Sequence, residues 1–216
     1  MKIITFLSVI FLTYPVMASE ADKYIKSGIQ FHDKGKYEEA SRQYKKALEI
    51  EPENSMALYE LAFTYMRAKK NKECIEVAQK GLKLKSKLQK KFNITLGSCY
   101  SQNGNINEAL KSFENGIKVD SKDPYLHLNI AVTLINIGKK QRAVLHLKEA
   151  IKFANGYASP YYFLAEIFRN SNYKIPAMFL YMKFVSLEPN SQRSVDASKK
   201  SIHFYMMGLR KIIQQI

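Results

Sequence analysis

The strongest constraint in this sequence is a repeat, because small residues recur every 34 or 35 positions over most of the chain. The series is Gly28, Ala62, Gly97, Ala131 and Ala165. A large apolar residue follows each of them after three positions, and a second small residue follows after twelve. A period of this length predicts stacked copies of one supersecondary unit, since a single copy cannot bury its apolar face alone.

Each unit has the pattern of two helices. Its first half places apolar residues at i, i+3, i+4 and i+7, which is one face of a helix. Unit five shows this most clearly, with Tyr161, Leu164, Ala165 and Phe168. A break follows, and in three units it holds a glycine, which a chain reversal favours: Gly35, Gly104 and Gly138. A second helix then begins, and its small residue (Ala40 in the first unit) is expected where the two helices cross closely.

The pattern resembles the tetratricopeptide repeat, a helix–turn–helix unit with the form L-G-x2-Y, then A-x3-F, then P. The best local match is Leu96, Gly97, Tyr100, Ala109 and Phe113, although the tryptophan frequent in that family is absent. The resemblance implies an all-α fold, a right-handed superhelical solenoid of stacked antiparallel helix pairs. It covers five units within residues 19–191: 21–54, 55–88, 90–123, 124–157 and 158–191.

Residues 192–216 read as one further amphipathic helix. Its apolar stripe contains Ile202, Tyr205, Met206, Leu209 and Ile213. A stacked array needs its last apolar face covered, so we expect a capping helix here. The alternative is an arm that binds a partner.

Residues 1–18 have the pattern of a signal peptide. Lys2 is followed by an almost wholly apolar run from Ile3 to Met17, and Val16 and Ala18 precede a cleavage site before Ser19. The run is short for a membrane span. We therefore expect an exported protein, periplasmic or secreted, and the Lys-, Ile- and Asn-rich usage favours a bacterial source. The alternative is an uncleaved N-terminal anchor.

The two cysteines are Cys74 and Cys99. Cys74 stands at the small helix-crossing position, where a buried thiol acting as a small apolar residue would explain it. Export leaves a disulfide between the two open as the alternative.

The formal net charge is +15, and removal of Lys2 with residues 1–18 lowers it by one. Export argues against a nucleic-acid partner, so solvated lysines on helix faces are the simplest interpretation. The alternative is an attraction to acidic partners, or a weak association with anionic membrane surfaces, through one basic patch: Lys80, Lys83, Lys85, Lys87, Lys90 and Lys91.

No catalytic, metal or cofactor site is predicted. The four histidines do not have the spacing of zinc ligands, and the isolated turn glycines do not form a phosphate loop. The function predicted is that of a non-enzymatic scaffold for a protein or peptide partner.

A stripe of the first helices, offset from the packing stripe, is unusually apolar, and exposed apolar patches mark interaction surfaces. We expect it to line a concave groove that binds an apolar or aromatic segment. The predicted groove residues are Ile25, Ile29, Tyr59, Phe63, Met66, Ile94, Leu128, Val132, Ile135 and Tyr162. Two alternatives are packing between neighbouring first helices and coverage by the C-terminal helix. Capture of a carboxylate, which the family resemblance would allow, is not expected because the matching places lack a cation: they carry Leu128, Val132 and Asn136 in unit four and Tyr162, Glu166 and Asn170 in unit five.

Overall fold

The structure is a computed structural model that describes residues 19–213. These residues form eleven helices and no strand. The first ten pair into antiparallel hairpins: α1 (Glu20–Asp33) with α2 (Tyr37–Ile50), α3 (Ser55–Arg67) with α4 (Asn71–Lys83), α5 (Gln89–Gln102) with α6 (Ile106–Val119), α7 (Pro124–Asn136) with α8 (Lys140–Phe153), and α9 (Ala158–Asn170) with α10 (Lys174–Leu187). The last helix is α11 (Gln192–Ile213). The predicted signal peptide, residues 1–18, lies outside the described residues.

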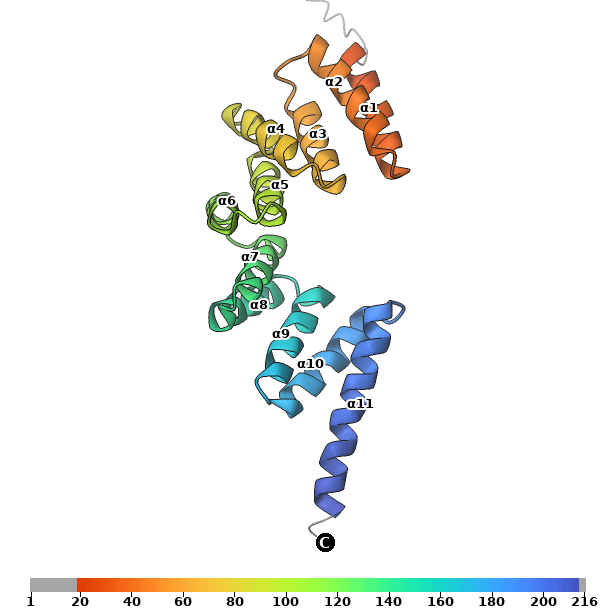
Figure 1. The fold of residues 1–216 in the computed structure, drawn as a ribbon, viewed down its shortest axis with the longest axis vertical. Coiled ribbons are helices and arrows are strands. Elements are labelled where there is room, and N and C mark those ends of the chain that lie inside the picture. The colour runs from red at the N-terminus through yellow and green to blue at the C-terminus, as the bar shows by residue number, and fades with distance from the viewer. Residues whose placement is uncertain (1–18, 214–216) are drawn as a thin grey trace, which may run out of the picture.

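The hairpins stack in chain order, with each second helix against the first helix of the next hairpin. Neighbouring first helices also contact one another along the array. The array is curved, with α1 at one end and α11 at the other, and α6 lies on the outer side of the arc (Figure 1). The predicted all-α solenoid of antiparallel helix pairs is therefore confirmed.

All five hairpins reverse through one residue with a left-handed backbone, at φ values between 58° and 82°. The residues are Gly35, Lys69, Gly104, Gly138 and Asn172. Of these five turn residues, the sequence pattern predicted only the three glycines. The same reversal forms at Lys69 because the amide of Lys70 donates to the carbonyl of Tyr65 at 2.9 Å, as the amide of Lys36 does to that of Phe31.

Side-chain caps fix the start of several first helices. Ser19 and Asp22 form a reciprocal capping box, and Asn54 accepts from the amide of Ala57 at 3.0 Å. Asp123 accepts from the amides of Tyr125 and Leu126 at 2.9 and 3.0 Å. These caps satisfy amides that a helix start leaves without partners.

Cys74 in α4 and Cys99 in α5 form a disulfide bond between fully buried side chains. The interpretation of Cys74 as a free buried thiol is therefore wrong, and the alternative of a disulfide holds. The bond joins the second hairpin to the third, across the boundary where the repeat gains one residue.

The predicted capping helix, α11, packs one face against α10. That face carries small residues, with Ser194, Ala197 and Ser201 buried and Phe204 partly buried beside Tyr181 and Phe184. Within residues 19–213, no helix has both the length and the apolar character that crossing a membrane requires.

Candidate partner-binding surfaces

Three aromatic rings from α1 and α3 form a stacked series that we call the aromatic row: His32, Phe63 and Tyr59. The ring centroids of His32 and Phe63 are 5.2 Å apart, and those of Phe63 and Tyr59 are 6.0 Å apart, with nearly parallel planes in both pairs. All three side chains are half-buried, so each presents one side to solvent.

The aromatic row is held from beneath and at both ends. His32 Nδ1 lies 2.8 Å from Thr64 Oγ1, and the ring of Tyr59 meets the buried Phe92 edge-on. Lys91 Nζ lies 5.1 Å from the centroid of the Tyr59 ring, at cation–π distance. Burial, with the nearby Glu60 carboxylate, raises the pKa of Tyr59. The arrangement offers flat apolar surface beside a cation, which suits an aromatic or apolar side chain.

The other predicted groove residues divide by exposure. Ile25 and Leu128 are buried, and Ile29 is exposed. The remaining ones are half-buried: Met66, Ile94, Val132, Ile135 and Tyr162. The buried part of the stripe therefore fits the alternative of packing between neighbouring first helices. A continuous binding groove along the whole stripe stays a prediction.

At unit five the stripe is covered by α11. Lys200 Nζ and the Arg193 guanidinium lie 5.7 and 5.5 Å from the centroid of the Tyr162 ring. Lys200 also pairs with Glu166 Oε1 at 2.5 Å. The second alternative, coverage by the C-terminal helix, thus describes this end of the array.

Glu166 is the centre of a network that sequence reasoning missed. Its carboxylate accepts from Tyr181 Oη at 2.6 Å and from Arg169 Nη2 at 2.9 Å, in addition to Lys200. Burial alone would raise the pKa of Glu166, but the hydrogen bonds from Lys200, Tyr181 and Arg169 outweigh it and lower the pKa. The cation absent from unit five is supplied by Lys200 of α11, 34 residues after Glu166, and this lysine is already paired with the Glu166 carboxylate.

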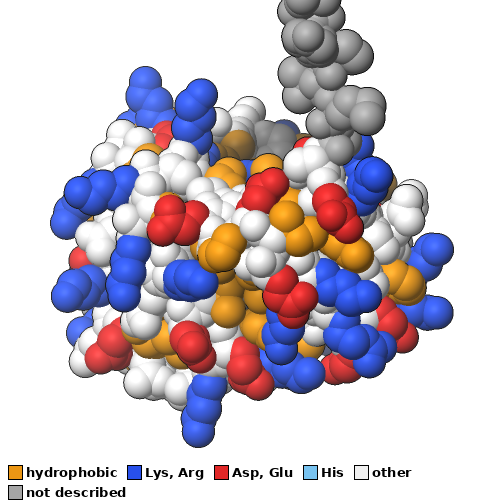
Figure 2. Space-filling view, turned by 90° about the horizontal axis from the view of Figure 1, so that it is seen from above, with side chains coloured by type: hydrophobic (Ala, Val, Ile, Leu, Met, Phe, Trp, Pro, Cys, Tyr) orange, Lys and Arg blue, Asp and Glu red, His pale blue; other side chains and the backbone are white. Residues whose placement is uncertain are grey.

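In the basic patch, Lys80, Lys83, Lys85, Lys87 and Lys91 are exposed. Lys90 is partly buried, and its Nζ pairs with Asp123 at 2.7 Å and Asp120 at 2.9 Å. These hydrogen bonds raise the pKa of Lys90. Lys90 therefore supports the start of α7. Elsewhere, at the α1–α2 end, Lys and Arg side chains alternate with acidic ones (Figure 2).

A second concave surface lies between α10 and α11, and we call it the terminal groove. It has a volume of about 670 Å³. Its lining is Met178, Phe179, Met182, Val185, Ser186, Ser198, Ser201, Ile202 and Tyr205. The apolar stripe predicted to let α11 cap the array does not pack on it, since Ile202, Tyr205 and Met206 are exposed and the smaller residues of α11 face α10 instead. The α10 half of the surface was not predicted. The available signal was that α10 carries apolar residues on every face.

Among the described residues, no three His, Cys, Asp or Glu side chains are grouped as metal ligands would be. Two histidines do meet, since Nδ1 of His127 in α7 and Nδ1 of His146 in α8 are 3.2 Å apart. The sequence spacing could not show this contact, because it depends on the hairpin.

Stacked hairpins with open helical faces define an α-solenoid, a class that presents extended surfaces to partners. Two parts of the chain match family models of the tetratricopeptide repeat. The family model described as "TPR repeat" matches residues 28–68, and the one described as "Tetratricopeptide repeat" matches residues 91–123.

Solved structures of low sequence identity share the fold. A thermophilic TPR protein of Thermus thermophilus is 19% identical, with a TM-score of 0.68 over 86% of this chain and 99% of that one. YrrB, described as a TPR protein with an unusual peptide-binding site, is 19% identical, with a TM-score of 0.61 over 83% and 92%. The pilF protein of Pseudomonas aeruginosa is 19% identical, with a TM-score of 0.72 over 88% and 90%. No curated protein sequence matches the chain.

Proposed function

We propose that this protein is an exported, non-enzymatic scaffold that binds an apolar or aromatic segment of a partner protein on the aromatic row. Tetratricopeptide-repeat proteins are protein-interaction scaffolds in general, and the finer assignment depends on one observation. Three stacked rings from two adjacent first helices remain half-exposed, although the predicted groove positions Ile25 and Leu128, on α1 and α7, are buried.

The chemistry of the aromatic row fits such a segment. Flat rings gain dispersion and apolar contact from a side chain laid across them, and Lys91 adds a cation at the Tyr59 end. The likeness to YrrB supports a peptide ligand, since that protein is described as having a peptide-binding site.

Two observations support export. Residues 1–18 have the sequence pattern of a signal peptide, a basic residue followed by an apolar run and small residues. Cys74 and Cys99 also form a disulfide bond. Disulfides persist in oxidising compartments such as the bacterial periplasm. The measurement is fractionation of cells that express the full chain or a chain without residues 1–18. Retention of both in the cytoplasm would contradict export.

Photo-crosslinking tests the aromatic row. A photoreactive phenylalanine analogue replaces Tyr59 in one variant and Tyr125, which is exposed on α7, in the control. We expect a discrete protein adduct from position 59, which disappears when Phe63→Ala is added, and no adduct from position 125. Equal adducts from both positions would argue against a site at the aromatic row.

The second candidate function is charge-driven binding to acidic partners or anionic membranes at the basic patch, which the exposure of five of its lysines favours. Salt separates the two, because screening weakens contacts between exposed charges far more than apolar ones. Two results together would support the basic patch instead. Binding would be lost as the salt concentration is raised, and it would also be lost in the triple variant Lys83→Glu, Lys85→Glu, Lys87→Glu.

A further inference from the structure

The terminal groove is lined by large apolar side chains that are exposed to solvent. On α10, Phe179 and Met182 are 60% and 52% exposed, and on α11, Ile202 and Tyr205 are 62% and 57% exposed. Polar atoms in the lining come mainly from Ser186, Ser198 and Ser201. Contiguous apolar surface of this kind marks a site of association.

The repeat shows what would normally occupy this position. Tyr161 and Phe168 on α9 point into their own hairpin, against α10, and Tyr161 is only 7% exposed. The residues 34 positions later on α11 are Val195 and Ile202, which are 46% and 62% exposed. α11 thus carries the face by which a first helix receives its second helix, and no described helix packs there.

We propose that the terminal groove binds one amphipathic helix of a partner protein, with acidic residues flanking the apolar stripe of that helix. The bound helix packs on α11, where a second helix of a further hairpin would pack, and also covers the exposed apolar side chains of α10. This site is separate from the aromatic row and does not depend on the function proposed there.

The charges around the groove determine the polarity of the partner. The only acidic residue within α10 and α11 is Asp196. The basic residues of the two helices up to residue 210 are Lys174, Lys183, Arg193, Lys199, Lys200 and Arg210. Arg193 pairs with Glu188 and Lys200 with Glu166, so the other four supply the positive charge.

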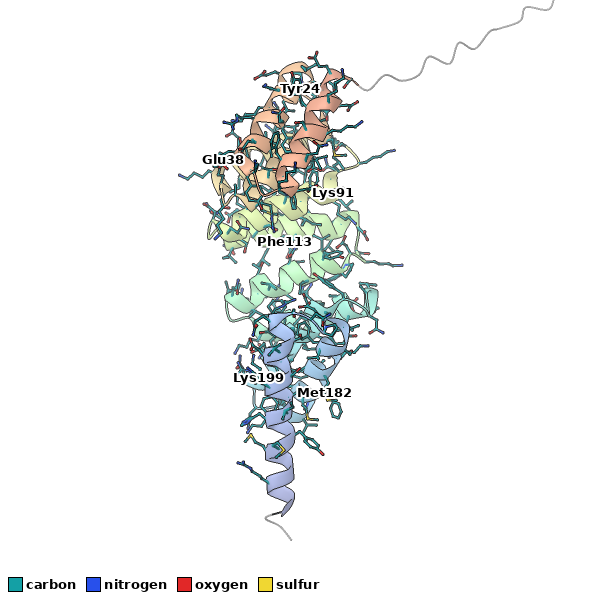
Figure 3. All side chains as sticks on the ribbon, turned by 90° about the vertical axis from the view of Figure 1, so that its right-hand side faces the viewer. Tyr24, Glu38, Lys91, Phe113, Met182 and Lys199 are labelled. Atoms are coloured by element: carbon teal, nitrogen blue, oxygen red, sulfur yellow. A yellow bond between two sulfur atoms is a disulfide. The ribbon has the colours of Figure 1, made fainter. Side chains whose placement is uncertain are left out.

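Helical periodicity places Lys183 beside the apolar stripe of α10 and Lys199 beside that of α11. Lys199 also lines a neighbouring hollow with Arg169 and Lys174, and each rim of the terminal groove therefore carries one exposed lysine. Met182 and Lys199 lie to either side of α11 in Figure 3. Acidic residues flanking a bound helix would meet these two rims.

Two other occupants fit less well. A second copy of this chain would bring one basic α10–α11 face against another, and like charges across an interface oppose association. An anionic membrane would attract the lysines, but a bilayer surface does not fill a groove between two helices. A separate helix satisfies both the shape and the charge.

The probe is a synthetic amphipathic peptide of about 18 residues, longer than α10. It has Leu and Met at helical i, i+3, i+4, i+7 spacing and Glu at the flanking positions, and a second peptide has Lys in place of Glu. Fluorescence anisotropy measures the binding of each to the full chain. We expect the Glu peptide to bind, and the Lys peptide to bind at least about tenfold more weakly.

Four variants locate the binding. Met182→Glu and Ile202→Glu should each weaken the Glu peptide at least about tenfold, because each places a charge in the apolar contact. Leu145→Glu is the matched control, since Leu145 is 63% exposed on α8, outside the groove. Lys183→Glu combined with Lys199→Glu should remove the preference for the Glu peptide. Every side chain changed in these variants is exposed, so folding is retained, and circular dichroism checks it.

Several results would overturn the proposal. They are the absence of binding by the Glu peptide, binding that Met182→Glu and Ile202→Glu leave intact, and equal binding of the two peptides. Light scattering that shows a dimer of the wild type and a monomer of Ile202→Glu would assign the groove to a second copy. Binding to phosphatidylglycerol vesicles that Ile202→Glu abolishes, without peptide binding, would assign it to a membrane.

Discussion

Gly97 of α5 lies directly against the ring of Phe113 of α6, sixteen residues later in the same hairpin. A Cβ atom at Gly97 would lie 2.5 Å from Cε1 of Phe113, and one at Gly28 would lie equally close to Tyr44. The small residue of the first helix therefore makes room for the aromatic residue of the second. The sequence analysis had placed this close approach opposite Ala40 and its equivalents.

Gly97→Ala should consequently destabilise the protein by about 1–3 kcal/mol, because an added methyl group overpacks a well-filled crossing. Urea denaturation followed by circular dichroism measures the change. Gly156→Ala is the control, since a Cβ there meets nothing within 4 Å. Equal stability of the two variants would show that the crossing relaxes without cost.

Lys69→Gly should stabilise the second hairpin by about 1 kcal/mol. Lys69 has a φ of 58°, a left-handed conformation that is costly for a residue with a Cβ atom. Glycine adopts it freely, and this gain exceeds its larger loss of chain entropy on folding. The comparison with Lys69→Ala, measured by thermal unfolding, separates the backbone effect from loss of the lysine charge. A Tm of Lys69→Gly at or below that of Lys69→Ala would contradict the prediction.

Replacing both cysteines by alanine should lower the free energy of unfolding by about 3 kcal/mol, because the disulfide closes a loop of 25 residues in the unfolded chain. Alanine occupies the position of Cys74 in the other units, so packing there is kept. Adding a reductant to the wild type should reproduce the loss and should leave the double variant unchanged. Sensitivity of the double variant to reductant would mean that another effect is being measured.

The repeat alone predicted the fold class, because the small and aromatic series fix the hairpin and its stacking. It missed Asn172 as a turn residue, although asparagine also adopts the left-handed conformation readily, and it missed Lys69, whose side chain gives no such signal. The site residues were harder. Tyr162 and Glu166 are covered by cations from α11, and that contact depends on how the last helix docks on α9, which no local pattern contains.

The partly buried position of His146, beside His127, makes stability depend on pH. Burial first, and then the neighbouring His127 and Arg142, lower the pKa of His146 below its ordinary 6.5. The unfolded chain therefore binds a proton at a higher pH than the folded one. The contribution of His146 to the free energy of unfolding is fully present above about pH 6.5. It is lost as the pH falls from there through the lowered pKa of the folded state.

His146→Gln should flatten this dependence, and the same change at the exposed His203 should not. Urea midpoints measured between about pH 5 and pH 8 give the slope for each variant. Burial also lowers the pKa of His32, so some slope should remain in His146→Gln. A slope equal to that of the wild type would remove His146 from the explanation.

Lys200→Met should loosen α11 without unfolding the rest of the array. Lys200 Nζ ties α11 to Glu166 of α9, and both side chains are mostly buried. Methionine keeps the length of the side chain but leaves the Glu166 carboxylate with only Tyr181 and Arg169 as donors. Loss of one partner of a partly buried pair should cost about 1 kcal/mol, after discounting for the exposed fraction of both groups. Because contacts in a solenoid are between neighbours, amide hydrogen exchange should quicken in α11 and α10 and stay unchanged in α1 to α4.

Lys199→Met, at an exposed position one residue earlier, is the matched control. Faster exchange throughout the array would show instead that α11 stabilises the solenoid as one cooperative unit.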